Sequence, residues 1–154
     1  NTLSQATAAE IARLHPSAVI ALGSTGSVSD SVLDDAVKAG GGAQKSRIQG
    51  PDRYQTADAV ASVLVQVHGG ATASKGVLLA TGLNFADALA GAAWAGASDR
   101  PLLLAPGTYV MPHTVQALQG FAAPSVAVLG GPGSVSDAVL DGLRAGTPPT
   151  SPPR

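Results

Sequence analysis

One segment of the sequence occurs twice, and this repeat limits the possible folds more than any other feature of the chain. Residues 22–34 read Leu-Gly-Ser-Thr-Gly-Ser-Val-Ser-Asp-Ser-Val-Leu-Asp, and residues 129–141 read Leu-Gly-Gly-Pro-Gly-Ser-Val-Ser-Asp-Ala-Val-Leu-Asp. The separation is 107 residues (129 − 22), and the segments ahead of both copies align without a gap. The chain is therefore predicted to consist of repeat units.

The repeat divides the chain into three predicted parts. We expect residues 1–45 to be the second half of a preceding unit and residues 46–146 to be a complete unit. Residues 147–154 are rich in Pro and are expected to form a linker or a disordered tail. Because a half-unit needs a neighbour to bury its core, we expect it to pack on the following repeat or on another chain.

Short apolar runs alternate with segments of helical periodicity along the chain. Aromatic residues make up only 3% of the sequence, so the core is expected to consist of Val, Leu, Ile and Ala. Buried strands are expected at 18–22, 76–80 and 101–105, further strands at 46–49 and 125–129, and helices at 4–14, 29–39, 54–67, 88–97, 112–121 and up to 144. This order predicts an α/β fold with a parallel sheet flanked by helices.

Charge and composition exclude several classes of function. The formal net charge is −1, so the chain lacks the basic field of a nucleic-acid-binding protein. Cysteine is absent and the three histidines are scattered, so no metal or cofactor site is expected. No apolar run reaches the roughly 18 residues of a membrane span, and no serine stands in a nucleophile signature. We therefore expect no catalytic residues and no enzymatic activity.

The densest polar cluster lies in residues 47–57, Arg-Ile-Gln-Gly-Pro-Asp-Arg-Tyr-Gln-Thr-Ala. Its two arginines either pair with nearby acids or bind phosphate and carboxylate groups of a polymer. We favour a mixed role for Arg47 and Arg53, with one structural and one facing a ligand or a neighbouring module. Asp52 is expected to cap the following helix. Tyr54 is expected to pack over the start of that helix, with stacking on a sugar ring as the alternative.

A second polar segment, residues 81–87, follows an expected strand and opens an expected helix. It therefore lies at the carboxyl edge of the sheet, where ligands bind in open α/β folds. Asn84 is expected to cap the helix and Asp87 to stabilise its first turn, with ligand binding as the second role of both. The Gly-rich turn at 130–133 lacks the lysine and the spacing of a phosphate-binding loop, so it is a weak nucleotide site.

Four motifs stand in a fixed order: residues 47–57, 79–89 (Leu-Ala-Thr-Gly-Leu-Asn-Phe-Ala-Asp-Ala-Leu), 101–104 (Pro-Leu-Leu-Leu) and 128–131 (Val-Leu-Gly-Gly), the last followed by Ser-Val-Ser. In this order and at this spacing they resemble the type 2 cell-wall-binding repeat. That family occurs in tandem, often threefold, in exported proteins of Gram-positive bacteria. The resemblance covers nearly all of residues 1–145, and the four ordered motifs make it specific.

The resemblance implies a fold, a partner and a location. The modules would be Rossmann-like or Toprim-like α/β units around a threefold or pseudo-threefold axis, bound noncovalently to an anionic wall polysaccharide or secondary wall polymer. The protein would be noncatalytic, extracellular and placed at the cell wall or cell surface. Family proteins usually carry three full units, whereas this chain shows about one and a half, so a homo-oligomer, with a trimer-like arrangement as one form, is expected. Polymer binding or module contact is assigned to Arg47, Asp52, Arg53, Tyr54, Asn84 and Asp87.

Two other functions stay open on the sequence alone. The Gly-rich turns at the strand ends also suit an α/β small-molecule or nucleotide-binding enzyme domain. A purely structural assembly module, whose arginines only join subunits, is the third hypothesis. Binding to purified walls and screening against nucleotides would separate the three.

Overall fold

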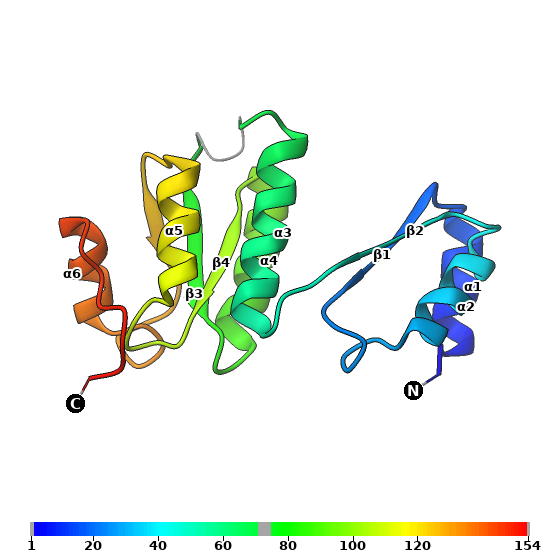
Figure 1. The fold of residues 1–154 in the computed structure, drawn as a ribbon, viewed down its shortest axis with the longest axis horizontal. Helices are drawn as coiled ribbons and strands as arrows, with labels where there is room; N and C mark the ends of the chain where they lie inside the picture. Colours follow the sequence, from blue (N-terminus) through cyan, green and yellow to red (C-terminus); the bar gives the residue numbers. More distant parts are fainter. Residues whose placement is uncertain (1, 71–74, 154) are drawn as a thin grey trace. The chain divides into compact units, whose positions relative to one another are not determined.

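The computed structural model describes residues 2–70 and 75–153. The chain falls into two compact units, Asn1–Asp52 and Arg53–Arg154 (Figure 1). The boundary between the units therefore falls after Asp52 in the sequence, a few residues beyond the repeat boundary expected at 45–46. The division into repeats stays a prediction.

The first unit contains two helices and two strands: α1 (Gln5–Leu14), β1 (Ala18–Leu22), α2 (Asp30–Ala39) and β2 (Gln44–Ile48). The two strands are parallel, with Ala18 opposite Gln44 and Leu22 opposite Ile48. Side-chain caps begin both helices, because Ser4 accepts from the backbone N–H of Thr7 and Ser29 from that of Val32. The strand expected at 46–49 therefore exists but begins earlier, at Gln44.

Residues 18–22 form a strand as expected, but the expectation that this strand is buried is wrong. Within β1 only Ala21 is buried, whereas Ile20 is 51% exposed and Leu22 is 54% exposed. The physical reason is the size of the sheet: β1 has one neighbouring strand, and the unit's helices lie on one side of the pair (Figure 1). An apolar run is therefore buried only where other elements of the fold cover it.

The second unit contains a three-stranded parallel sheet in the order β4-β3-β5. Every residue of the central strand is buried. The strands of both units are parallel and flanked by helices, so the predicted α/β class is confirmed, although the strands form two sheets. The elements of the second unit are α3 (Arg53–Val67), β3 (Val77–Thr81), α4 (Ala86–Ser98), β4 (Leu102–Ala105), α5 (Pro112–Phe121), β5 (Val126–Val128) and α6 (Asp137–Ala145).

Alternate residues of the central strand face the two sides of this sheet. On one side Val77 and Leu79 join a buried cluster that includes Ala61 of α3 and Val139 of α6. On the other side α4 packs closely: a Cβ added at Gly91 would lie 2.2 Å from Cδ1 of Leu129. The second unit therefore has a covered sheet, which the first unit lacks.

The two copies of the repeated segment have the same local backbone. The glycines after β1 and β5, Gly23 and Gly130, have φ angles of +96° and +95°. Ser29 and Ser136, which precede the following helices, have matching extended dihedral angles. The helices ahead of the copies, α1 and α5, also begin and end at positions that are 107 residues apart. The sequence repeat is therefore also a repeat of local structure.

Residues 147–149, in the segment expected to be a linker or disordered, lie against the second unit. The N–H of Val110 donates to the carbonyl oxygen of Pro149 at 2.8 Å, and the N–H of Thr147 donates to that of Gly142 at 2.8 Å. Gly142 leaves room for the tail, because a Cβ there would lie 2.7 Å from Cα of Pro148. The start of the tail is therefore held by the fold.

Candidate functional site

The carboxyl edge of the sheet in the second unit holds an open pocket of about 310 Å³. Because the strands are parallel, the segments that follow β3 and β4 meet at this edge, and the first residue of α3 reaches it as well. The pocket thus forms where the sequence analysis expects ligand binding. It is lined by Arg53, Thr81, Gly82, Leu83, Asn84, Phe85, Ala88 and Leu104.

Arg53 is the cationic residue of this pocket. Its Nη1 donates to the carbonyl oxygen of Gly82 at 2.8 Å, which ties the first residue of α3 to the chain after β3. The side chain is exposed, and a guanidinium carries five N–H donors. The bond to Gly82 therefore orients the guanidinium while other donors can face a ligand.

Tyr54 packs against Gly82, one of the residues that line this pocket. Its ring lies so close to Gly82 that an added Cβ there would be 2.6 Å from Cε1 of the ring. The residue is half-buried, as expected for a side chain that packs rather than one that presents a free face. Gly82 is therefore required by the close approach of this ring, because any larger residue would displace the tyrosine.

Asn84 lines the pocket but does not cap α4, so the capping expectation is wrong. The N-cap residue is Phe85, it makes no side-chain cap hydrogen bond, and its backbone is in the right-handed helical region. The helix thus starts later than the residue types suggest, and Asn84 stands one position too early to reach the first free N–H groups. Its exposed amide is left at the pocket wall.

Asp87 lies in the first turn of α4, as expected, but lines a different pocket. This second pocket, of about 260 Å³, is formed with Trp94, Leu129 and Gly130 among others. Oδ2 of Asp87 lies 2.5 Å from the place that a Cβ on Gly130 would occupy. A carboxylate against the Gly-rich turn repels a phosphate, so this arrangement counts against a nucleotide at residues 130–133.

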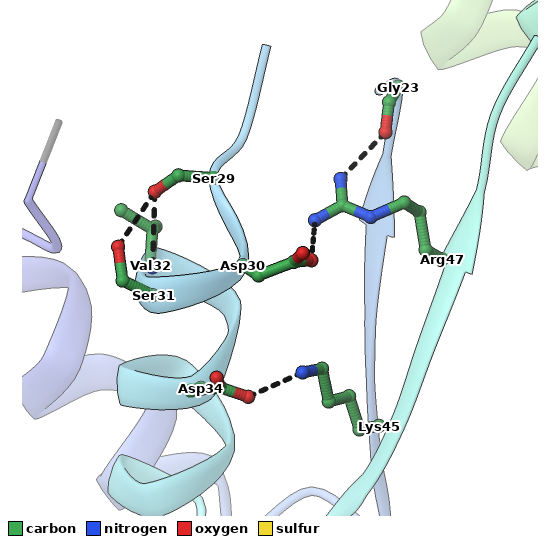
Figure 2. Close-up of polar contacts among 8 residues, drawn as sticks. All are labelled: Gly23, Ser29, Asp30, Ser31, Val32, Asp34, Lys45 and Arg47. Atoms are coloured by element: carbon green, nitrogen blue, oxygen red, sulfur yellow. Dashed lines mark hydrogen bonds and ion pairs between the residues drawn. The ribbon is translucent and has the colours of Figure 1, made fainter. Parts of the chain in front are cut away.

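Arg47 belongs to the first unit, where it has a structural role (Figure 2). Nη1 donates to the carbonyl oxygen of Gly23 at 2.8 Å, and Nη2 pairs with Oδ1 of Asp30 at 2.9 Å. The side chain is only 13% exposed. Arg47 therefore connects β2 to the turn after β1 and to the start of α2, and Asp30 is a partner that sequence reasoning missed.

The structure thus places the six candidate residues in three settings. Arg53 and Asn84 line the pocket at the carboxyl edge of the sheet, Tyr54 lies against Gly82 of that pocket, and Asp87 lines the second pocket. Arg47 stabilises the first unit, and the half-buried Asp52 is the last residue of that unit. The assignment of these residues to polymer or module contact stays a prediction.

A buried polar group that the sequence analysis missed joins α3 to α5. Oδ2 of Asp58 lies 2.5 Å from Nδ1 of His113 and accepts from Oγ1 of Thr114 at 3.1 Å. Nε2 of His113 is buried and has no hydrogen-bond partner among the described residues, so it does not face an open site. The group therefore serves to hold two helices together. The sequence signal for this polar group was Asp58, an acid on the face of the expected helix that carries its apolar residues.

Two further findings bear on function. Among residues 2–70 and 75–153, no group of three or more His, Cys, Asp or Glu side chains is placed to hold a metal ion. Over the same residues, no helix has both the length and the apolar character that crossing a membrane requires.

Comparison with known proteins identifies a family and gives similar solved structures. Residues 47–140, more than half of the chain, match the family described as Cell wall binding domain 2 (CWB2). A search of the curated proteins gave no match. Among solved structures, Cwp6 from Clostridium difficile is similar, with 27% sequence identity and a TM-score of 0.80. The match covers 95% of this chain and 22% of that chain, so this chain spans about a fifth of the length of that protein.

Proposed function

The chain belongs to the cell wall binding domain 2 family, and on this premise we propose that its second unit binds an anionic saccharide of a wall polymer. The proposed site is the pocket at the carboxyl edge of the sheet. The observation that carries the proposal is the exposed guanidinium of Arg53, which the carbonyl oxygen of Gly82 orients beside Asn84. The role of the protein is then noncatalytic attachment to the outside of a Gram-positive cell.

The residues of the pocket suit the chemistry of such a polymer. A planar guanidinium can bind a carboxylate or phosphate through two parallel N–H bonds. The amide of Asn84 both donates and accepts, which matches sugar hydroxyl groups. Leu83 and Phe85 are 67% and 78% exposed and offer apolar surface for the C–H face of a sugar ring.

The other candidate residues have supporting roles in this proposal. Tyr54 fixes the chain at Gly82, and Gly82 in turn holds the guanidinium of Arg53. Arg47 stabilises the first unit through its contacts with Gly23 and Asp30. Asp87 keeps anions away from the Gly-rich turn, so that a negatively charged polymer is directed to the pocket that holds Arg53.

Sedimentation with purified Gram-positive cell walls tests the proposal. We expect the protein to pellet with walls at low salt and to be released as salt rises, because exposed charge contacts are screened. Arg53→Gln should weaken binding about tenfold or more, the value of a lost charge-assisted hydrogen bond. Protein that stays in solution with walls at low salt would contradict the proposal.

Arg144→Gln is the matched control for this experiment. Arg144 lies in the same unit, on α6, with 70% of its side chain exposed and a pair to Asp141. The substitution removes the same charge without touching the pocket, so wall binding should be unchanged. An equal loss in both variants would show that net charge, and not the pocket, determines attachment.

A further inference from the structure

The second pocket, which contains Asp87, lies between α4 and the turn after β5. One wall is the face of α4 that carries Asp87, Ala90 and Trp94, and the other wall is formed by Leu129 and Gly130. Apart from the carboxylate of Asp87, the side chains that line this pocket belong to alanine, leucine and tryptophan. The pocket therefore combines an apolar surface with a single acidic group.

The carboxylate of Asp87 is half-buried and makes no hydrogen bond or ion pair with the described residues. Asp35 and Asp137 also have no ionic partner among these residues, but both are exposed to water. Partial burial of a charge without a partner costs free energy, which a cation in the pocket would recover. Among the described acids, Asp87 is therefore the one that a cationic ligand would stabilise most.

The first copy of the repeat shows a cation bound at the matching turn. There the carbonyl oxygen of Gly23 accepts from Nη1 of Arg47 at 2.8 Å (Figure 2). Gly130, the counterpart of Gly23, has a matching φ, and its carbonyl oxygen accepts no hydrogen bond from the described residues. Oδ2 of Asp87 lies against this glycine. The turn therefore offers a carbonyl acceptor beside a carboxylate.

Trp94 determines the direction in which a ligand would lie. It follows Asp87 by two turns on the same face of α4, about 10 Å along the helix, and it is 45% exposed. The guanidinium of Arg100 lies 5.5 Å from the centre of the indole ring, so a second cation at the ring would be repelled. The positive end of a ligand therefore belongs at Asp87, and its apolar part belongs at Ala90 and Trp94.

We propose that this pocket binds a primary alkylammonium group, the chemistry of a lysine side chain. The ammonium donates to the carboxylate of Asp87 and to the carbonyl oxygen of Gly130. The four-carbon stem lies along Ala90 towards the ring of Trp94, where its methylene groups pack on apolar surface. Arg53 lines the other pocket, so this inference does not depend on polymer binding.

The fluorescence of Trp94 tests the proposal in the full chain, which has no other tryptophan. The protein is titrated at neutral pH and constant ionic strength with Nα-acetyl-lysine amide. Nα-acetyl-norleucine amide has the same stem without the ammonium and serves as the neutral probe. The lysine probe should give a saturable change and bind about tenfold or more tightly than the norleucine probe, as hydrogen bonds to a charged group imply. Equal affinities, or no saturable change with the lysine probe, would overturn the proposal.

Three variants test the position of the site. Asp87→Asn should weaken binding of the lysine probe about tenfold or more, and Ala90→Leu, which fills the pocket but keeps the charge, should abolish it. Asp141→Asn is the matched control and should bind normally, because Asp141 is an exposed acid of the same unit outside the pocket. Equal losses in the two aspartate variants, or normal binding by Ala90→Leu, would contradict the proposal. Circular dichroism checks folding, and Asp87→Asn and Ala90→Leu test the site independently of each other.

Discussion

The repeated segments 22–34 and 129–141 have the same backbone in opposite surroundings. Gly23 and Gly130 share a φ near +95°, and the helices that follow, α2 and α6, both begin at an aspartate. Yet the strand ahead of the first copy is largely exposed, and the sheet that carries the second copy is covered on both faces. Local sequence therefore determines the backbone of the segment, whereas neighbouring elements determine how much of it is buried.

Truncation of one apolar side chain in each sheet should give the largest difference in stability between the two units. Leu79→Ala should lower the free energy of unfolding by about 2–5 kcal/mol, because Leu79 is fully buried in the central strand. Ile20→Ala should cost about 1 kcal/mol or less, because Ile20 is half exposed. Urea unfolding followed by circular dichroism gives both values. The fluorescence of Trp94, the only tryptophan, reports the second unit separately.

Similar costs for these two variants would contradict the comparison. In that case β1 would be covered in solution by a neighbour that the structure does not contain. Repeating the measurement over a range of protein concentrations would then show whether that neighbour is another copy of the chain, since association makes stability concentration-dependent.

The paired glycines give the second test. Alanine at Gly23 or Gly130 has to adopt a positive φ, which costs about 1–2 kcal/mol in either copy. At Gly130 the new Cβ would also lie 2.5 Å from Oδ2 of Asp87, whereas at Gly23 the nearest side-chain atoms, on Ser27, lie 3.2 Å away. Gly130→Ala should therefore be the more destabilising variant, by about 1–3 kcal/mol. Thermal or urea unfolding of both variants measures the difference.

A double variant identifies the cause of that difference. Asp87→Ala combined with Gly130→Ala should recover part of the lost stability, because the carboxylate that the new Cβ meets is gone. The same Asp87→Ala change combined with Gly23→Ala should be additive. Additivity in both pairs would show that the contact with Asp87 has no energetic weight.

The smallest expected effect lies on the first helix. Glu10 and Arg13 form an exposed pair in α1, and their counterparts in α5 are Ala117 and Gly120, so the second copy has no such pair. The hydrogen bond from Arg13 lowers the pKa of Glu10 below its ordinary value. A lowered carboxyl pKa stabilises the fold above the unfolded pKa, and this contribution is lost as the pH falls through the folded pKa.

Glu10→Gln should therefore shift the urea midpoint slightly at pH 7 and leave it unchanged in strong acid. Substitution of Ala117 by Gln in α5 serves as the control, because no ion pair is removed there. A large shift at neutral pH would indicate that α1 contributes more to the first unit than an exposed pair can explain.

The parts of the fold that could be predicted are those with local causes. Residues 112–121 form a helix as expected, because Pro112 fits the first helical position and the chain leaves the helix at Ala122 in a left-handed conformation. The strand expected at 76–80 lies at 77–81 and is fully buried, because its apolar run is continuous. Periodicity and turn residues are sufficient for such elements.

The parts that could not be predicted depend on contacts between distant residues. The partners Asp58 and His113 are 55 positions apart, and no local pattern joins them. Asn84 is a residue type that often caps helices, yet the N-cap of α4 is Phe85. Asn84 therefore lines the pocket instead. The division of the six candidate residues among three settings follows from the sheet topology, which composition does not reveal.

The tail after α6 also has a mechanical consequence. The carbonyl oxygen of Pro149 is held by the N–H of Val110, and Val110 is a fully buried residue of the second unit. A pull on the residues after Pro149 therefore reaches the fold at the connection between β4 and α5, next to the core. In a protein that attaches to a surface, a force applied to the residues after Pro149 is shared between this hydrogen bond and the chain that leads back to α6. The stronger the hydrogen bond, the smaller the part of that force that acts on α6.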